Sequence, residues 1–458
     1  MALFGLLLVS YFAFGGYRNW RYKVESDGKY YYAYLASLVE DGDLDFSNQF
    51  ASPKYPWMRT EIDHYGLRNQ VSPETRRPPN PFPPGAALLW APFFAGAWGL
   101  GALLRQAGIP VDPNPYGRWF QYATMLSGPV YAALSATLLA RLAARFVSLA
   151  SAWLSAGVLL FASPLYYYAV FEPSMSHVSD LFAFVLFLHA VLLCREQEGF
   201  GAYVALALSG ALLILVRPQN AATVAIFSCV LAWERGTPGR AAGGRSRLAR
   251  LVACSLALLL GAIPILLLNR YLLGKLVLVS QGPGFLRLDQ PMVVEVLFSA
   301  RNGLFSHHPI LLVGLAGFVA LLASGRGEVP RWWLWALLGS FVAQVTLNSC
   351  AADWWSGHSF GQRRLLSSLP LFVLGLSFVV ERLRELSGGT MTRPVLGAAA
   401  AAALLGLYLT LIHVFAWSYD EPHDVLHWMF VRVPGKVLSR IQALPALPVL
   451  PVLPTPPP

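Results

Sequence analysis

The stretch Ser26-Asp27-Gly28-Lys29-Tyr30-Tyr31-Tyr32-Ala33-Tyr34 follows the first hydrophobic segment, Ala2 to Gly16, by about ten residues. It places a carboxylate just after an apolar helix, in a chain whose charged residues amount to only 13%. Its tyrosines recur at helical spacing, which predicts a short interfacial helix with a tyrosine face at the headgroup boundary. Asp27 either caps this helix or acts as a general base, and the two roles are compatible.

The composition predicts an all-α polytopic membrane protein. The chain has 458 residues, of which 56% are hydrophobic, whereas a soluble domain carries about 25% charged residues. Many apolar runs approach the ~20 residues that span a bilayer. The net charge of +10 is mostly arginine in short loops, so it indicates orientation among membrane lipids and no nucleic-acid partner. The cysteines show no metal-binding or disulfide spacing.

Arginine placement predicts about eleven transmembrane helices plus interfacial or re-entrant helices in the first loop. Arginine-rich short loops alternate along the chain, and the positive-inside rule puts them in the cytoplasm. Residues 2–16 are expected to be a retained first helix. If the Asp27 loop is then outside, one segment must not cross, and the best candidate is 83–104, which begins with Pro83-Pro84-Gly85.

The domain organisation follows from these segments. Residues 1–418 are expected to form the transmembrane domain, with 17–117 as the first extracytoplasmic loop. Residues 419–441 are amphipathic and basic, which suits the membrane interface. Residues 442–458 are rich in proline and predict a disordered tail.

The outward loops carry polar residues that are costly near hydrocarbon unless they face a cavity. The candidates for substrate binding are Glu25, Tyr31, Glu172, His177, Arg217, Arg301, His307, His308, Asp353, Trp354, Trp355, His358, Arg363 and Arg364. Each outer arginine alone suits headgroup contact, but together Arg217, Arg301, Arg363 and Arg364 indicate a phosphate-binding cluster. The two tryptophans suit either sugar stacking or interfacial anchoring.

Metal binding is a weaker interpretation of the same loops. The acidic turn at residues 40–45 begins like a calcium loop, but Phe46 stands where glycine is needed, so a solvated turn is favoured. The histidines at 307, 308 and 358 have no fixed spacing to Asp27. No metal ligand is therefore assigned, and a divalent metal remains an open alternative.

Several of these motifs resemble the GT-C superfamily of polytopic glycosyltransferases, which includes protein O-mannosyltransferases and the lipid A aminoarabinose transferase. The resemblance covers about residues 1–418. It rests on Asp27 to Leu35, Asp41 to Phe46, Asn80 to Gly85, Glu172 to His177 and Trp354 to Arg364.

The resemblance implies a polyprenyl-phosphate-linked sugar donor and a glycan, lipid or protein acceptor. Asp27 would deprotonate or orient the acceptor hydroxyl, which attacks the anomeric carbon with inversion, and later arginines would stabilise the departing phosphate. It further implies a bacterial inner membrane with the active site facing the periplasm. Two features depart from the family. Ser26 separates Glu25 from Asp27, where many members have adjacent acids. The chain also lacks a large soluble domain after the last span, so transfer to protein asparagine is not expected.

Two other functions remain as alternatives: a transporter or flippase of lipid-linked glycans, and a non-catalytic assembly subunit. A transporter is expected to show internal repeats and mid-membrane charges. The sequence shows no repeat, and its ionisable residues crowd into outer loops. An assembly subunit would tolerate loss of the Asp27 carboxylate.

Overall fold

The computed structural model describes residues 2–14, 23–51, 71–197, 199–233, 236–237, 240–241, 244–282, 284–327, 330–357 and 359–415. The predicted segments 419–441 and 442–458 lie outside the described residues, as does the candidate His358.

The described chain is helical apart from one two-stranded hairpin, in which β1 pairs antiparallel with β2. In chain order the elements are α1 (Ala2–Phe14), α2 (Gly28–Glu40), α3 (Ser47–Ala51), α5 (Gly85–Gln106), α6 (Arg118–Met125), α7 (Ser127–Ala143), α8 (Leu149–Phe161), α9 (Leu165–Val170), α10 (His177–Glu196), α11 (Phe200–Val216), η2 (Pro218–Asn220), α12 (Ala221–Trp233), β1 (Gly236–Thr237), β2 (Arg240–Ala241), α13 (Gly244–Leu273), α14 (Val293–Phe298), α15 (Leu304–His307), α16 (Ile310–Ser324), α17 (Arg331–Ser349), η3 (Arg363–Ser368), α18 (Leu369–Leu386) and α19 (Arg393–Phe415).

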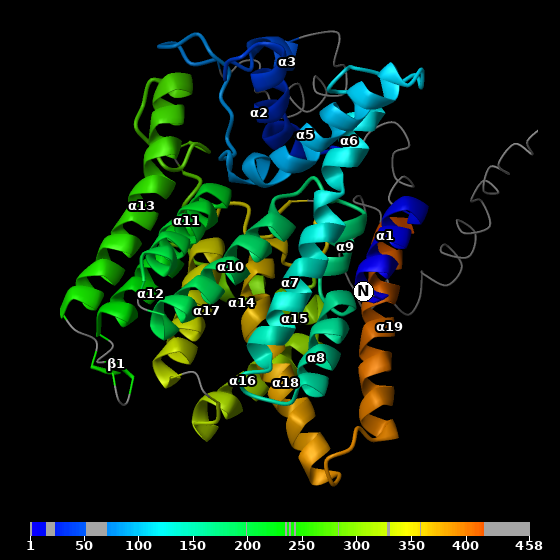
Figure 1. Ribbon diagram of the computed structural model, residues 1–458, viewed down its shortest axis with the longest axis vertical. Coiled ribbons are helices and arrows are strands. Elements are labelled where there is room, and N and C mark those ends of the chain that lie inside the picture. Colours follow the sequence, from blue (N-terminus) through cyan, green and yellow to red (C-terminus); the bar gives the residue numbers. More distant parts are fainter. Residues whose placement is uncertain are drawn as a thin grey trace, which may run out of the picture.

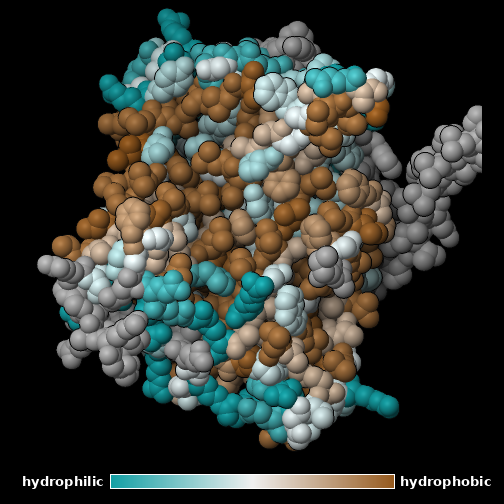
Figure 2. Space-filling view, in the orientation of Figure 1, coloured by the Kyte–Doolittle hydropathy of each residue, from teal (hydrophilic) through white to brown (hydrophobic). Residues whose placement is uncertain are grey.

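The surface has the layering of an integral membrane protein. Figure 2 shows a broad hydrophobic band between hydrophilic residues at the top and bottom of the molecule. Among the described residues, six helices are long and apolar enough to cross a bilayer, and shorter apolar helices such as α11 and α16 lie beside them. The predicted all-α polytopic membrane fold is confirmed, whereas the number of eleven spans stays a prediction.

The first loop forms a separate upper layer. In Figure 1, α2, α3, α5 and α6 lie at the upper end of the molecule, which the top of α13 also reaches, while the hairpin and the α18–α19 connection lie toward its lower end. The start of α5 is pressed against the end of α11, because a Cβ on Gly85 would lie 2.2 Å from the backbone of Leu215 and Val216. By length and composition α5 could cross a membrane, so the non-crossing placement of 83–104 stays a prediction.

The tyrosines of α2 correct one expectation. The helix begins at Gly28 as predicted, but Tyr30, Tyr31 and Tyr34 are only 3%, 4% and 3% exposed. Residues of the first loop cover them. The Tyr34 hydroxyl donates to the Phe82 carbonyl at 2.6 Å, and the Tyr31 hydroxyl donates to Ser176 Oγ at 3.0 Å. Buried tyrosine hydroxyls usually have such a partner. The tyrosine face is therefore an internal packing surface and not a headgroup contact.

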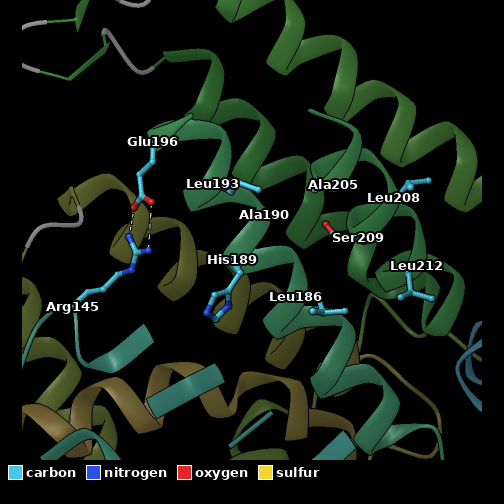
Figure 3. A pocket seen from close by; sticks show the side chains of 10 residues that line it. All are labelled: Arg145, Leu186, His189, Ala190, Leu193, Glu196, Ala205, Leu208, Ser209 and Leu212. Atoms are coloured by element: carbon cyan, nitrogen blue, oxygen red, sulfur yellow. Dashed lines mark hydrogen bonds and ion pairs between the residues drawn. The ribbon is translucent and has the colours of Figure 1, made fainter. Parts of the chain in front are cut away.

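An open apolar groove of about 530 Å³ runs between α10 and α11 on the side of the bundle. Figure 3 shows its wall of leucines and alanines, with an ion pair between Arg145 and Glu196 at one end. The Nδ1 atom of His189, also in the wall, lies 2.9 Å from the Val185 carbonyl oxygen. The groove is part of the hydrophobic side of the molecule.

Two helices approach each other through glycine. A Cβ placed on Gly375 of α18 would lie 1.8 Å from the carbonyl oxygen of Gly314 on α16, and one on Gly317 would lie 2.2 Å from the Gly375 carbonyl oxygen. Small residues at such contacts let helix backbones pack closely inside a membrane. The α16–α18 contact therefore depends on the absence of side chains at these positions.

We predict that Gly375→Ala destabilises the fold by about 1–3 kcal/mol, the usual cost of overpacking a close contact. Gly397→Ala is the matched control, because a Cβ added to Gly397 in α19 would have nothing within 4 Å of it. There the substitution adds helix propensity, worth up to about 1 kcal/mol. Thermal unfolding in detergent measures both variants, and equal stability of the two would contradict the packing argument.

Candidate functional site

A cavity of about 390 Å³ lies where the upper layer meets the bundle. Its polar lining comes from segments far apart in the sequence: Asp27, Tyr31, Asn80, Ser176, His177, Arg217, Gln219, Asn269, Ser280, Gln281, Asn348, Arg363 and Arg364. The start of α2, the start of α10, the end of α11 and the start of η3 thus converge on one space. The cavity brings together the carboxylate and three of the four outer arginines that the sequence singled out.

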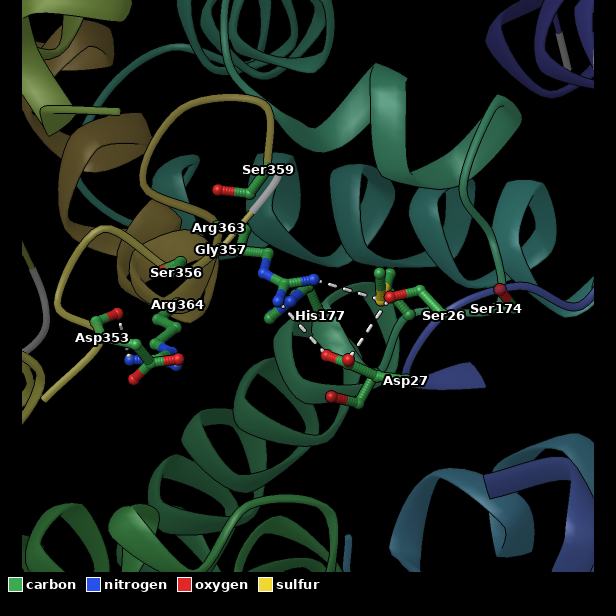
Figure 4. A network of polar contacts seen from close by, with 12 residues as sticks. Ser26, Asp27, Ser174, His177, Asp353, Ser356, Gly357, Ser359, Arg363 and Arg364 are labelled. Carbon is green, nitrogen blue, oxygen red and sulfur yellow. Dashed lines mark hydrogen bonds and ion pairs between the residues drawn. The ribbon is translucent and has the colours of Figure 1, made fainter. Parts of the chain in front are cut away.

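Asp27 is paired directly with Arg363. Its Oδ2 lies 3.3 Å from Arg363 Nη2, with side-chain exposures of 21% for Asp27 and 10% for Arg363. Asp27 occupies the N-cap position of α2 but makes no side-chain cap hydrogen bond. Figure 4 shows its carboxylate turned toward the guanidinium. The capping alternative therefore does not account for where this side chain points.

The neighbouring Arg364 is held by the loop before it. Its Nη2 lies 2.5 Å from Asp353 Oδ2, and its Nη1 donates to the Asp353 carbonyl at 3.2 Å. Asp353 thus orients an arginine of the cavity from outside the cavity lining. The acidic partner offsets the free-energy cost of burying the guanidinium, since an unpaired buried charge is strongly destabilising.

A single asparagine organises the loop that carries both arginines. Nδ2 of Asn302 lies 2.9 Å from the Trp355 carbonyl oxygen, 3.3 Å from that of Gly357 and 3.1 Å from Ser359 Oγ. Asn302 itself has a φ of +67°, a conformation that asparagine tolerates better than most residues. The amide therefore fixes the curved backbone that leads into Arg363.

Arg217 enters the cavity from the end of α11 on a third set of contacts. Its Nη1 lies 3.0 Å from His177 Nδ1 and 3.9 Å from Asp180 Oδ2. Asp180 is fully buried, and its Oδ1 accepts from Asn220 Nδ2 at 2.6 Å. The arginine is thus anchored to two residues of the first turn of α10.

One side of the cavity is apolar. Ile265 and Leu268 of α13, Leu347 of α17, and Leu278 and Leu286 of the connection between α13 and α14 line it. Leu278 and Leu286 are both 42% exposed. The cavity therefore joins a charged wall to a greasy wall near the molecular surface, which suits an amphiphilic ligand.

Other predicted site residues lie away from the cavity lining. Arg301 stacks on Trp355, with its guanidinium carbon 4.4 Å from the ring centroid, and Trp354 packs edge-on against Trp355. Glu25 and Glu172 are partly buried near Asp27 and Arg363 without lining the cavity. These residues support the loops around the site.

The histidine pair also lies elsewhere. His307 and His308 are buried at 5% and 1% exposure, and the His308 ring packs edge-on against Phe360. Burial, with His307 beside it, lowers the pKa of His308 to about 3, which keeps that ring neutral. Across the described ranges no three His, Cys, Asp or Glu side chains come together as a metal-binding group. A divalent metal stays an untested alternative.

Sequence reasoning missed the polar residues beneath the cavity. Asp180, Asn220 and Gln344 are 1%, 2% and 4% exposed. Nε2 of Gln344 donates to Asn220 Oδ1 at 2.9 Å, which continues the chain of contacts from Asp180. Asp180 could have indicated this group from the sequence, because it lies in the first turn of an apolar helix. Acidic residues inside membrane helices are rare and usually functional.

No known protein-family profile and no curated protein matches the sequence. The solved structures of similar fold include the following two. One is ArnT from Cupriavidus metallidurans bound to undecaprenyl phosphate, at 15% identity and a TM-score of 0.49, covering 92% of this chain and 66% of that one. The other is the archaeal oligosaccharyltransferase AglB from Archaeoglobus fulgidus, in complex with an inhibitory peptide and a dolichol-phosphate, at 11% identity and a TM-score of 0.48, covering 90% and 55%. This chain thus spans about two thirds and just over half of their lengths.

Lys23, which is close to Asp27 in the chain, is expected to make the stability of the fold depend on pH. Its side chain is buried, and its Nζ donates to the Val170 carbonyl at 3.3 Å. Burial lowers its pKa from 10.5 to about 7, against the opposing effect of Glu25. Between these two values the unfolded chain binds the proton and the folded chain does not, so the free energy of unfolding rises with pH across that window.

We expect Lys23→Met to be more stable than the wild type near pH 7 and to lose this advantage as the pH approaches 10. Unfolding in detergent from pH 6 to 10 measures the difference between the two proteins, which cancels the titration of other groups. The exposed Lys275 supplies a control, because Lys275→Met leaves no buried ammonium to relieve. A difference that is constant with pH would contradict the assignment.

Proposed function

We propose that the protein is a glycosyltransferase that moves a sugar from a polyprenyl-phosphate-linked donor to an acceptor at the extracytoplasmic face of the membrane. The observation that carries the proposal is the meeting of Asp27 with Arg217, Arg363 and Arg364 in one cavity that also has an apolar wall. A phosphate, an acceptor hydroxyl and a lipid chain each have a matching surface in that space.

Asp27 supplies the acceptor side of the reaction. Its carboxylate can accept a hydrogen bond from the acceptor hydroxyl and take up the proton as the oxygen attacks. The new bond joins that oxygen to the anomeric carbon, and the bond from the anomeric carbon to the phosphate oxygen breaks on the opposite side. The electron pair leaves with the polyprenyl phosphate, so a single displacement inverts the anomeric configuration.

The arginines supply the leaving-group side. Negative charge grows on the phosphate as the glycosidic bond breaks, and guanidinium groups match phosphate oxygens with paired donors. Fixed positive charge aimed at a developing anion is often the largest contribution to catalysis. Because Arg363 also pairs with Asp27 at 3.3 Å, it can hold the carboxylate and the departing phosphate in register with each other.

The apolar wall supports a lipid-linked donor over a soluble nucleotide sugar. A prenyl chain that extends from the bilayer can remain in apolar surroundings along this wall, whereas a nucleotide sugar has no apolar chain to place there. Leucines on α13, on α17 and on the connection after α13 offer such a surface next to the arginines. We infer that the site faces away from the cytoplasm, because the loops on the opposite side are rich in arginine. In the bacterial inner membrane that the resemblance implies, this side is the periplasm.

We predict that Asp27→Asn abolishes transfer. Asparagine keeps the shape of the side chain and one oxygen acceptor for Arg363, so we expect the variant still to be expressed. Removal of a general base costs typically about 10²–10⁴-fold in rate. Mass spectrometry of surface glycolipids and glycoproteins measures the effect in cells whose only copy carries the variant. The product mass lost relative to wild type identifies the sugar.

The control for this experiment is Asp43→Asn, an exposed acid of the same loop that does not line the cavity. A deletion strain gives the full loss. If Asp27→Asn is expressed normally and makes the wild-type product, Asp27 has no catalytic role and the transporter or assembly functions become the better explanation.

The phosphate subsite gives a separate prediction. Arg217→Gln and Arg364→Gln are each expected to weaken binding of undecaprenyl phosphate by about 10- to 100-fold, the range for a lost hydrogen bond to a charged group. Binding to the purified protein in lipid nanodiscs measures this directly. Arg326→Gln is the matched control, because Arg326 pairs with Glu385 outside the cavity. If all variants bound undecaprenyl phosphate with equal affinity, the proposal that its phosphate binds in this cavity would be contradicted.

A further inference from the structure

A chain of polar contacts leads from the helix bundle to one ring nitrogen in the cavity. Nε2 of Gln344 donates to Asn220 Oδ1 at 2.9 Å, and Nδ2 of Asn220 donates to Asp180 Oδ1 at 2.6 Å. Asp180 Oδ2 lies 3.9 Å from Arg217 Nη1, which lies 3.0 Å from His177 Nδ1. Asn220, Asp180 and His177 are at most 4% exposed, so water does not compete for these contacts.

The direction of the last contact is fixed by chemistry. A guanidinium has five N–H donors and no acceptor, and it stays protonated in proteins. The hydrogen bond between Arg217 and His177 therefore requires that Nδ1 of the histidine is the acceptor and carries no proton. In a neutral imidazole the proton must then be on Nε2.

A second proton on this ring is opposed from several sides. It would turn Nδ1 into a donor facing the donor Nη1 of Arg217, only 3.0 Å away. Burial disfavours a charge on this ring, which is only 4% exposed, and the positively charged Arg217, Arg363 and Arg364 line the same cavity. The nearby carboxylates are engaged: Asp27 with Arg363, Asp180 with Asn220 and Asp353 with Arg364.

The opposite nitrogen faces the cavity. His177 lines it, and the edge-on ring of Tyr168, with its centroid 5.2 Å away, supports the imidazole. In the described part of the chain Nε2 makes no hydrogen bond and is not sealed from the cavity. In Figure 4 the ring lies behind Arg363, beside the Asp27 carboxylate. An N–H at this position points toward whatever occupies the space.

We propose that His177 is a permanently neutral hydrogen-bond donor, locked in the Nε2–H form by Arg217 and Asp180, that binds an oxygen of the substrate in this cavity. This assignment rests on the proposed function only for the identity of the substrate, a phosphorylated or hydroxylated sugar carrier. It excludes His177 as the general base, because its lone pair is occupied, and leaves that role to Asp27. Asp180 is a positioning residue that acts through Arg217.

The protonation state is tested without any activity measurement. Protein labelled with ¹⁵N-histidine in lipid nanodiscs is examined by NMR from pH 5 to 8, and the His177 signals are those missing from His177→Gln. We expect an unprotonated Nδ1 and a protonated Nε2 across the whole range. A proton on Nδ1, or a change to the doubly protonated ring within that range, would overturn the assignment.

Substitutions of His177 distinguish a role as hydrogen-bond donor to the substrate from a purely structural role. Glutamine can accept from Arg217 and still donate into the cavity, so we expect His177→Gln to keep transfer within about tenfold of wild type, whereas His177→Leu loses about 10- to 100-fold. Asp180→Asn should mix the two ring forms in the NMR spectrum and lower the transfer rate. Equal activity of the Gln and Leu variants would contradict the donor role.

The outcome of the Asp27 experiment separates the two proposals. If Asp27→Asn stays active while His177 keeps its Nε2–H form, the glycosyltransferase proposal fails and the assignment of the histidine stands. If Asp27→Asn is inactive but the His177 ring titrates, the donor assignment fails and the enzyme stands.

Discussion

The ion pair between Asp27 and Arg363 joins the first loop of the chain to its last third, and the arrangement of the site depends on it. Charges placed where a helix bundle meets its cover lose hydration, and their mutual attraction offsets that loss only when the geometry is good. The pair has a separation of 3.3 Å and low exposure on both sides. The start of α2 positions Asp27, and the loop that Asn302 holds positions Arg363.

The same rule explains the rest of the charged wall. Arg364 is met by Asp353, and Arg217 is met by Asp180 and His177. Each guanidinium therefore has one side fixed by a protein acceptor and another that lines the cavity. Arginine can make both contacts at once because its five N–H donors form a planar fork. A lysine ammonium is a single point charge and lacks this geometry.

Much of the fold could be predicted from the sequence, because bilayer thickness and the closure of backbone hydrogen bonds restrict a long apolar chain to helices. Loop chemistry predicted the start of α2 at Gly28 and a cluster of outer arginines, and the resemblance joined Asp27 to that cluster; the roles of these residues stay predictions. The burial of the α2 tyrosines could not be predicted, since helical periodicity identifies a face but not what covers it. Arg301 looked equivalent to the other arginines, and only the path of the backbone places it on Trp355 and outside the cavity.

The residues that sequence reasoning missed have a common physical cause. Asp180, Asn220 and Gln344 lie in three helical segments whose contacts are set by packing, so their proximity is invisible in one dimension. Inside a membrane bundle a lone carboxylate or amide is costly, and a connected series gives each of its residues at least one polar partner. The series ends on Arg217 and His177, at the cavity wall. A polar network that is costly to bury and that ends at a substrate-sized space is better explained by orienting a reacting group than by stability, because apolar packing would hold the same helices together at least as well.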